Sequence, residues 1–197
     1  MKIIKYLLYF IGGIILLFLL LGMLKPQVEY GHEITVDKSA DIAWAVHQDQ
    51  SKYDQWLEGF KSMEKLSGEE GEVGSTYRIV VNPGEGQEDF EMIETLVSIE
   101  PEDHVTVSMD SEGMVFDQTT TFSENEGKTT IKTESVVKGK GMMMKSMFAL
   151  MSMGGSFQKQ EEKHLEALKT LINENTTDYF PEPEPAPVQD TISTDSI

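Results

Sequence analysis

Alternating apolar and polar positions recur through the middle of the chain and predict a series of β-strands. The first strand is expected at residues 28–36, where Val28, His32 and Val36 share one face. Turn sequences rich in Gly, Asp and Asn separate the later strands, so we expect an antiparallel meander of about six or seven strands. The later strands are expected near residues 76–81, 88–99, 104–109, 114–122 and 129–137.

Helical patterns lie before and after the meander. Ser39 and Asp41 are typical of a helix start and predict a short helix after the first strand, and residues 53–56 predict a second short helix or turn. A stripe of apolar residues predicts one long helix over about residues 145–173, weakened or bent at Gly154–Gly155. A long helix beside a meander should cross the concave face of the sheet. The expected fold class is therefore α+β, a curved antiparallel sheet around a long C-terminal helix, with a hollow interior.

An apolar segment near the N-terminus predicts a membrane anchor. Residues 7–24 contain no charged side chain and approach the roughly 20 apolar residues that a membrane-spanning helix needs. A cleaved signal peptide is the alternative, but no small-x-small cleavage site follows the segment. Lys2 and Lys5 precede the segment and only Lys25 closely follows it. This charge bias favours a cytoplasmic N-terminus in a single-pass membrane protein, with the folded domain outside the cytoplasm.

The chain divides into an anchor at residues 1–26, a folded domain at 27–175 and a tail at 176–197. The tail is acidic and rich in proline, so we expect it to be disordered. A docking motif for a protein partner is the alternative, and the sequence names no such partner. The formal net charge of −18 argues against a nucleic-acid partner, so none is expected, and it argues against binding to anionic lipid head groups.

Six short motifs lie at residues 28–36, 39–44, 53–56, 71–75, 94–101 and 165–169. Together they resemble the polyketide cyclase/dehydrase-like group of the START/Bet v 1-like (SRPBCC) superfamily. The resemblance covers residues 28–173 and implies a helix-grip fold, and members with a single N-terminal membrane span are familiar. The superfamily includes lipid carriers, hormone receptors, cyclases and chaperone regulators, so the resemblance specifies the fold better than the function. A proline often found between the positions of Tyr53 and Trp56 is missing here.

A few polar residues fall at positions that should face the hollow interior. Glu161 lies on the apolar stripe of the closing helix, where it would fix a hydroxyl or amine of a ligand, unless the helix turns it to solvent. His32 lies on the apolar face of the first strand, where a structural role is the simpler interpretation. Arg78 and Glu94 would bind a ligand only if their strand faces point inward.

Methionines crowd the start of the closing helix, at positions 142–144, 147, 151 and 153. Thioether side chains adapt to irregular apolar shapes, so this cluster predicts a deformable mouth for a hydrophobic ligand, with ordinary core packing as the alternative. The complete set of predicted ligand-binding residues is His32, Trp56, Arg78, Glu94, Phe116, Met147, Met151, Phe157 and Glu161.

The sequence carries no motif of a known catalytic centre. It has no cysteine, no Gly-x-Ser-x-Gly motif, no phosphate-binding loop and no cluster of histidines, so we assign no catalytic residue, cofactor or metal. The expected function is a membrane-anchored domain that holds a lipid or another hydrophobic small molecule. The alternatives are a cyclase- or dehydratase-like enzyme using Glu161 or His32 as acid or base, and a protein-interaction module.

Overall fold

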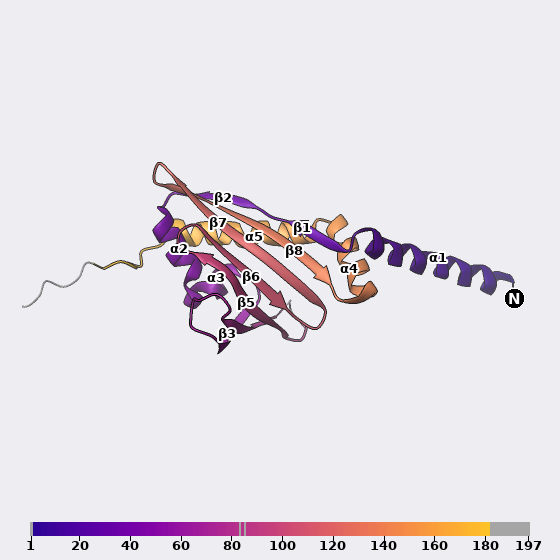
Figure 1. The fold of residues 1–197 in the computed structure, drawn as a ribbon. Helices are drawn as coiled ribbons and strands as arrows, with labels where there is room; N and C mark the ends of the chain where they lie inside the picture. Colours follow the sequence, from indigo (N-terminus) through magenta and orange to yellow (C-terminus); the bar gives the residue numbers. More distant parts are fainter. Residues whose placement is uncertain (1, 83, 85, 182–197) are drawn as a thin grey trace, which may run out of the picture.

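The computed structural model describes residues 2–82, 84 and 86–181 (Figure 1). An N-terminal helix projects from one end of a curved sheet, and two short helices and a 3-10 turn lie between the second and third strands. The strands are β1 (Gln27–Tyr30), β2 (Glu33–Val36), β3 (Phe60–Ser67), β4 (Thr76–Val81), β5 (Phe90–Glu100), β6 (His104–Asp110), β7 (Met114–Asn125) and β8 (Lys128–Gly139). The helical elements are α1 (Lys2–Leu24), α2 (Ala40–Gln48), η1 (Gln50–Lys52), α3 (Tyr53–Trp56), α4 (Gly141–Met153) and α5 (Ser156–Asn173).

All strand pairs in the sheet are antiparallel, and the predicted meander is confirmed from β4 to β8, with β3 as an additional strand beside β4. The strand order is β1-β8-β7-β6-β5-β4-β3, and β2 also pairs with β8. The longest pair, β7 with β8, closes through Glu126 and Gly127, which both have positive φ. A two-residue turn with both residues in this region matches the right-handed twist of its flanking strands.

The first predicted strand is divided into two. β1 and β2 both pair with β8, but the chain leaves the ladder between them at Gly31 and His32. A Cβ atom on residue 31 would lie 2.1 Å from the carbonyl oxygen of Thr133, so only glycine permits this close approach. The side-chain alternation continues through the break, which is why the sequence pattern gives no sign of it.

The closing helix is also divided, into α4 and α5. Gly155 separates them with a φ of 69°, in the left-handed region that glycine adopts without strain. The bend expected at Gly154–Gly155 is thus a complete break, and the two helices run in different directions (Figure 1). α5 follows one face of the sheet, as expected for the closing helix, and α4 lies beside α1 at the end of the domain.

Two separate apolar clusters fill the two ends of the space between α5 and the sheet. The larger cluster joins α2, α5 and strands β2, β7 and β8, and it contains Leu165, Leu168 and Ile172 of α5. The smaller cluster joins Val28, Val137 and Phe148, with Phe157 of α5 packed against it. The core is therefore concentrated at the two ends, and the middle of α5 passes between them.

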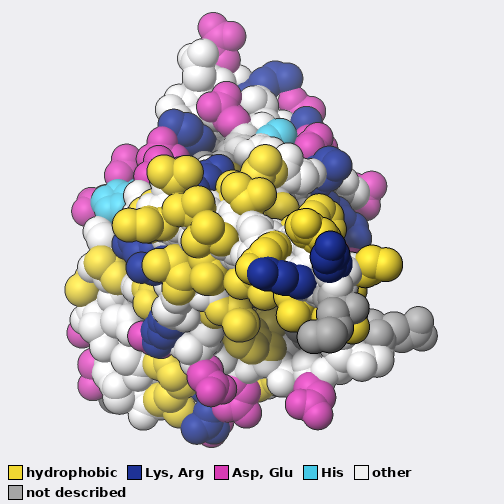
Figure 2. Space-filling view, turned by 90° about the vertical axis from the view of Figure 1, so that its right-hand side faces the viewer, with side chains coloured by type: hydrophobic (Ala, Val, Ile, Leu, Met, Phe, Trp, Pro, Cys, Tyr) yellow, Lys and Arg dark blue, Asp and Glu magenta, His cyan; other side chains and the backbone are white. Residues whose placement is uncertain are grey.

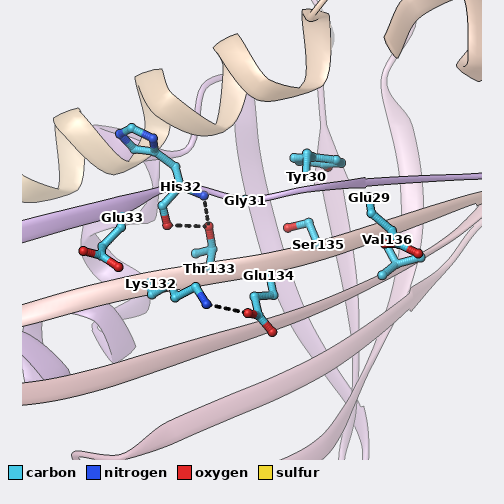
Figure 3. A pocket seen from close by; sticks show the side chains of 10 residues that line it. All are labelled: Glu29, Tyr30, Gly31, His32, Glu33, Lys132, Thr133, Glu134, Ser135 and Val136. Carbon is cyan, nitrogen blue, oxygen red and sulfur yellow. Dashed lines mark hydrogen bonds and ion pairs between the residues drawn. The ribbon is translucent and has the colours of Figure 1, made fainter.

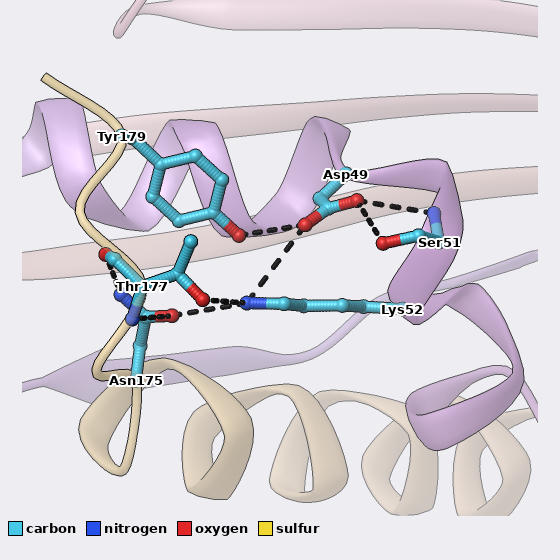
Figure 4. A network of polar contacts seen from close by, with 6 residues as sticks. All are labelled: Asp49, Ser51, Lys52, Asn175, Thr177 and Tyr179. Carbon is cyan, nitrogen blue, oxygen red and sulfur yellow. Dashed lines mark hydrogen bonds and ion pairs between the residues drawn. The ribbon is translucent and has the colours of Figure 1, made fainter.

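The two ends of the chain differ in what the structure describes. α1 is long and apolar enough to cross a membrane, a property that signal sequences share. After α5 the chain packs back on the domain: Lys52 Nζ donates to Asn175 Oδ1 (3.0 Å), and the Tyr179 hydroxyl donates to Asp49 Oδ2 (2.7 Å; Figure 4). The domain boundary at residue 175 remains a prediction, and most of the predicted disordered tail lies outside the described residues.

Candidate ligand cavity

A cavity of about 600 Å³ lies between the sheet and α5. Its size falls within the range of pockets that bury drug-sized molecules. The wall is mainly apolar and aromatic, with residues from β4, β5, β6 and β7 on one side and from α2, α3 and α5 on the other. The aromatic lining includes Trp44, Trp56, Tyr77, Phe116 and Phe157.

Strand alternation decides which side chains reach the cavity. On β4, Tyr77 and Ile79 line it, whereas Arg78 between them points to the outer face. On β5, Met92, Glu94 and Leu96 line it. Because the strands are paired in register, Tyr77 lies directly opposite Glu94. The inward face thus places one carboxyl group in an otherwise apolar row.

Glu94 lies in the sheet wall, and burial raises the pKa of its carboxyl group from 4.5 to about 7. Loss of hydration disfavours the charged form of an acid, which explains the direction of the shift. Near neutral pH, this carboxyl group is therefore divided between its protonated and ionised forms. It can both donate and accept a hydrogen bond within the cavity.

Glu161 reaches the cavity from the opposite side, on α5, and only 6% of it is exposed. Gln118 Nε2 donates to Glu161 Oε1 at 3.1 Å and lies 3.0 Å from the Ser135 hydroxyl, so a short polar strip crosses from α5 to β8. Burial is the main reason that the pKa of Glu161 is raised. Burial, followed by the charge of Glu161, also raises the pKa of Tyr30.

Two histidines to which sequence reasoning assigned no chemistry also line the cavity. Burial lowers the pKa of His47 to about 4, so this imidazole is neutral at pH 7, packed against Trp56 and Phe122. His164 Nε2 accepts a hydrogen bond from the backbone N–H of Glu58 at 3.3 Å, and burial lowers its pKa. The signal for His164 was its position one helical turn after Glu161.

The charged residues of the lining are acidic. Glu58, Glu70, Glu94 and Glu161 belong to it, and among the described residues no Lys or Arg does. Glu58 is paired with Lys163, whose Nζ lies 2.6 Å from its carboxylate. Glu94 and Glu161 are the two buried carboxyl groups of the lining, and no Lys or Arg of the described lining pairs with them. A polar group of a ligand placed between them would meet hydrogen-bond acceptors and negative charge.

The structure brings together Trp56, Glu94, Phe116, Phe157 and Glu161 from the predicted ligand-binding set, because all of them line the cavity. Gln118 was missed, although it shares the inward face of β7 with Phe116. Their roles in binding remain predictions. The sequence predicts lining residues best where apolar neighbours on both sides show which face of the strand or helix is buried.

The other predicted residues lie elsewhere, which corrects their expected position. Arg78 is on the outer face, 3.1 Å from Glu64 and 3.9 Å from Glu91. His32 lies at the break between β1 and β2, beside a separate open depression lined by residues 29–33 and 132–136 (Figure 3). Met147 and Met151 are on α4, each more than one-third exposed, and no described residue of α4 lines the cavity. The predicted methionine-rich mouth is therefore not part of this cavity, because the helix break directs α4 away from it.

Among the residues that the structure describes, no group of three or more His, Cys, Asp or Glu residues is arranged to hold a metal ion.

Comparisons with known proteins agree with this architecture. A family model described as polyketide cyclase/dehydrase and lipid transport matches residues 27–172. Similar solved structures include protein CV1439 from Chromobacterium violaceum (13% identity, TM-score 0.57, covering 75% of this chain and 99% of that one). Truncated norcoclaurine synthase from Thalictrum flavum is 20% identical, with a TM-score of 0.54 and coverage of 76% and 95%. The di-domain ARO/CYC protein BexL is 12% identical, with a TM-score of 0.58 and coverage of 77% and 52%. No curated protein matched the sequence.

Proposed function

Because the chain belongs to the polyketide cyclase/dehydrase and lipid transport family, we propose that it binds a hydrophobic small molecule in the cavity and is held at a membrane by α1. The observation that carries the proposal is the unfilled space between the two apolar clusters along α5. An apolar ligand there would gain about 25 cal/mol for each Å² of apolar surface removed from water.

The charged groups in the wall restrict the polar end of the ligand. A carboxylate or phosphate would face Glu94 and Glu161 without a Lys or Arg from the described lining to offset the repulsion. A hydroxyl group or a protonated amine would instead donate to these carboxyl groups. The preferred ligand therefore has a long apolar body and a polar end that is neutral or positively charged.

The membrane part of the proposal rests on α1. Its apolar residues are almost all exposed in the folded chain, and only Gly22 is buried. A row of exposed Leu, Ile and Phe side chains of this length is stable in lipid and unfavourable in water. The charge bias around α1 favours placing the cavity domain outside the cytoplasm.

Displacement of a fluorescent apolar probe tests the binding site. The full chain in detergent should bind Nile red saturably, and dodecanol and dodecylamine should displace it, whereas dodecanoate should do so at least about tenfold less well. Ile79→Trp fills the cavity from β4 and should weaken Nile red binding. Ile93→Trp is the matched control, because Ile93 is exposed on the neighbouring strand β5.

Two outcomes would count against this proposal. Equal binding of Nile red to the Ile79→Trp and Ile93→Trp variants would place the probe outside the cavity. Displacement by dodecanoate as strong as that by dodecylamine would remove the argument from the acidic lining. Native mass spectrometry of the purified chain would then identify which molecule, if any, it retains.

Acid–base catalysis of the cyclase or dehydratase type is a second candidate, favoured by the pKa of Glu94 near 7. A group with a pKa near the working pH is best suited to transfer a proton in either direction. Under this alternative, the retained molecule would be converted by the unmodified chain and only bound by the Glu94→Gln variant. Conversion at the same rate by both would exclude Glu94 as the acid or base.

A further inference from the structure

The methionine-rich helix α4 is fixed to the end of α1. Gly22 is the only buried residue of α1, and it touches α4 so closely that a Cβ atom there would lie 2.4 Å from the Ser146 hydroxyl oxygen. Just beyond α1, Lys25 Nζ donates to the Ser152 hydroxyl of α4 at 2.9 Å. If α1 crosses a bilayer, α4 must therefore lie at the surface of that bilayer.

α4 has one face in the domain and one face outside it. Ser146, Phe148 and Ala149 are buried, with Phe148 packed into the smaller apolar cluster. α1 packs against part of α4, and the outer face beyond that contact is apolar and exposed. Figure 2 views this end of the molecule along α1 and shows hydrophobic side chains, those of α1 included, gathered in its middle, with acidic side chains toward the margin. The exposed residues of α4 are Met142, Met143, Met147, Leu150, Met151 and Met153.

The sequence segment that contains α4 has a charge opposite to that of the whole chain. The full sequence has a formal net charge of −18, but residues 135–160 contain four lysines and no Asp or Glu. Lys138 and Lys140 are paired with Asp117 and Asp110, whereas Lys145 forms no ion pair with the residues that the structure describes. An apolar surface bordered by lysines is the composition that binds the interface of an anionic bilayer.

We propose that the outer face of α4 docks into the surface of the bilayer that α1 crosses, so that the domain is attached at two points. This inference rests on the membrane anchor in the proposed function. Continuity with α1 and the local positive charge identify a lipid surface as the occupant. Methionine side chains suit this role because they adapt to an irregular apolar environment. A single spanning helix would let the domain swing, whereas a second contact fixes the orientation of the cavity relative to the membrane.

Single-cysteine labelling tests the proposal on the full chain, which has no natural cysteine. An environment-sensitive fluorophore would be placed at Met143→Cys or Leu150→Cys on α4, at Leu16→Cys in α1, and at Glu126→Cys in the distant β7–β8 turn. The proteins would be reconstituted in vesicles of phosphatidylcholine and phosphatidylglycerol that carry lipid-attached quenchers. We expect shallow quenchers to reduce the α4 signals at least about threefold more than the signal at residue 126, and deep quenchers to reduce the signal at residue 16.

Each other outcome overturns the inference in a distinct way. Quenching at residue 16 with α4 labels still in water would leave the anchor in place and exclude docking of α4. No quenching at residue 16 would remove both the anchor and the docking proposal. An apolar environment at α4 that lipid quenchers do not reach, together with energy transfer between differently labelled chains, would show that a second copy covers this face.

Discussion

Glu94 and Glu161 face one cavity from opposite walls but differ in what compensates their burial. Glu161 accepts a hydrogen bond from Gln118, whereas Glu94 forms no side-chain hydrogen bond with the described residues. Burial is the largest cause of the raised pKa at both positions. Because Glu94 lacks such a hydrogen bond, its ionisation should affect the stability of the fold more clearly than that of Glu161.

The Glu94→Gln variant should be more stable than the unmodified chain at alkaline pH. Folding raises the pKa of the Glu94 carboxyl group, so the native state binds this proton more tightly than the unfolded state does. The native state of the unmodified chain therefore keeps its full stability below the ordinary pKa of 4.5 and loses stability as the pH rises through about 7. The gain should approach roughly 3 kcal/mol at about pH 8 and become small near about pH 5. Thermal unfolding at both pH values measures it.

Glu91→Gln is the matched control for this experiment. Glu91 lies on the same strand, but its side chain is 68% exposed and points toward Arg78 on the outer face. Its replacement should change stability by less than about 1 kcal/mol, with no step between pH 5 and 8. An identical pH profile for the Glu91→Gln and Glu94→Gln variants would contradict burial as the origin of the pKa shift at Glu94.

Glu161→Gln should change ligand preference more than ligand capacity. The amide keeps the size of the side chain but removes its charge, so displacement of Nile red by dodecylamine should weaken about tenfold relative to displacement by dodecanol. Glu162→Gln is the control, because Glu162 is the exposed neighbour on α5. Equal losses for both alcohol and amine would indicate a general disturbance of the cavity.

The sequence predicted the inward residues where apolar neighbours fixed the face, as for Phe116, Phe157 and Glu161. It does not decide whether Arg78 and Glu94 point inward, because a period of two shows that residues share a face without showing which face points inward. The pairing of β4 with β5 resolves this: Tyr77 lies opposite Glu94, and Arg78 lies outside. His32 stays on the face that it shares with Tyr30, because the break at Gly31 leaves the alternation unchanged, but it borders the separate depression and does not line the cavity (Figure 3).

Helices and strands are predicted best from the sequence where apolar residues recur with a regular period. Strands β4 to β8 and the short helix α2 follow the predicted segments closely. β3 was missed because most of its residues are exposed, so its sequence has no alternation. α4 and α5 were merged because the apolar stripe continues across Gly154 and Gly155, although the helix does not.

The contact between α1 and α4 gives a prediction for Gly22. Gly22→Leu should separate the two helices, because a Cβ atom at this position would also lie 2.5 Å from the backbone nitrogen of Ser146. Spin labels at residues 25 and 152 in the full chain would report this as a longer and broader distance distribution. Gly12→Leu is the matched control in the same helix, since nothing lies within 4 Å of the position of its Cβ atom.

An unchanged distance distribution in the Gly22→Leu variant would mean that α1 and α4 are not packed as described. A change of equal size in the Gly12→Leu variant would point to a general effect on α1 rather than to the contact.

For the whole molecule, the extent of the folded domain can be tested by truncation. A chain that ends after residue 181 should unfold like the full chain. A chain that ends after residue 174 should be less stable by roughly 1–2 kcal/mol, because it loses the hydrogen bond from Tyr179 to Asp49 and the packing of Tyr179 on the larger cluster. Thermal unfolding of both truncated chains measures the difference. Equal midpoints would place the domain boundary at residue 175, as predicted from the sequence.

The distribution of charge was visible in the sequence, but its position in space was not. A net charge of −18 argued against anionic lipid as a partner. The fold gathers an acid-free segment at the end from which α1 projects, so the total charge does not describe the surface nearest to α1. Composition averages over the molecule, whereas binding depends on the local field.

The open side of β3 has a further consequence for a protein held in a membrane. β3 is the last strand in the sheet order, so one row of its backbone groups has no partner strand among the described residues. Tethered chains meet by diffusion in two dimensions, where an unprotected border of this kind promotes intermolecular aggregation. Lys61, Glu64 and Lys65 are exposed on β3, and register shifts interrupt its pairing with β4 at both ends. These irregular, charged positions would prevent the β3 edges of adjacent chains from pairing into a continuous sheet.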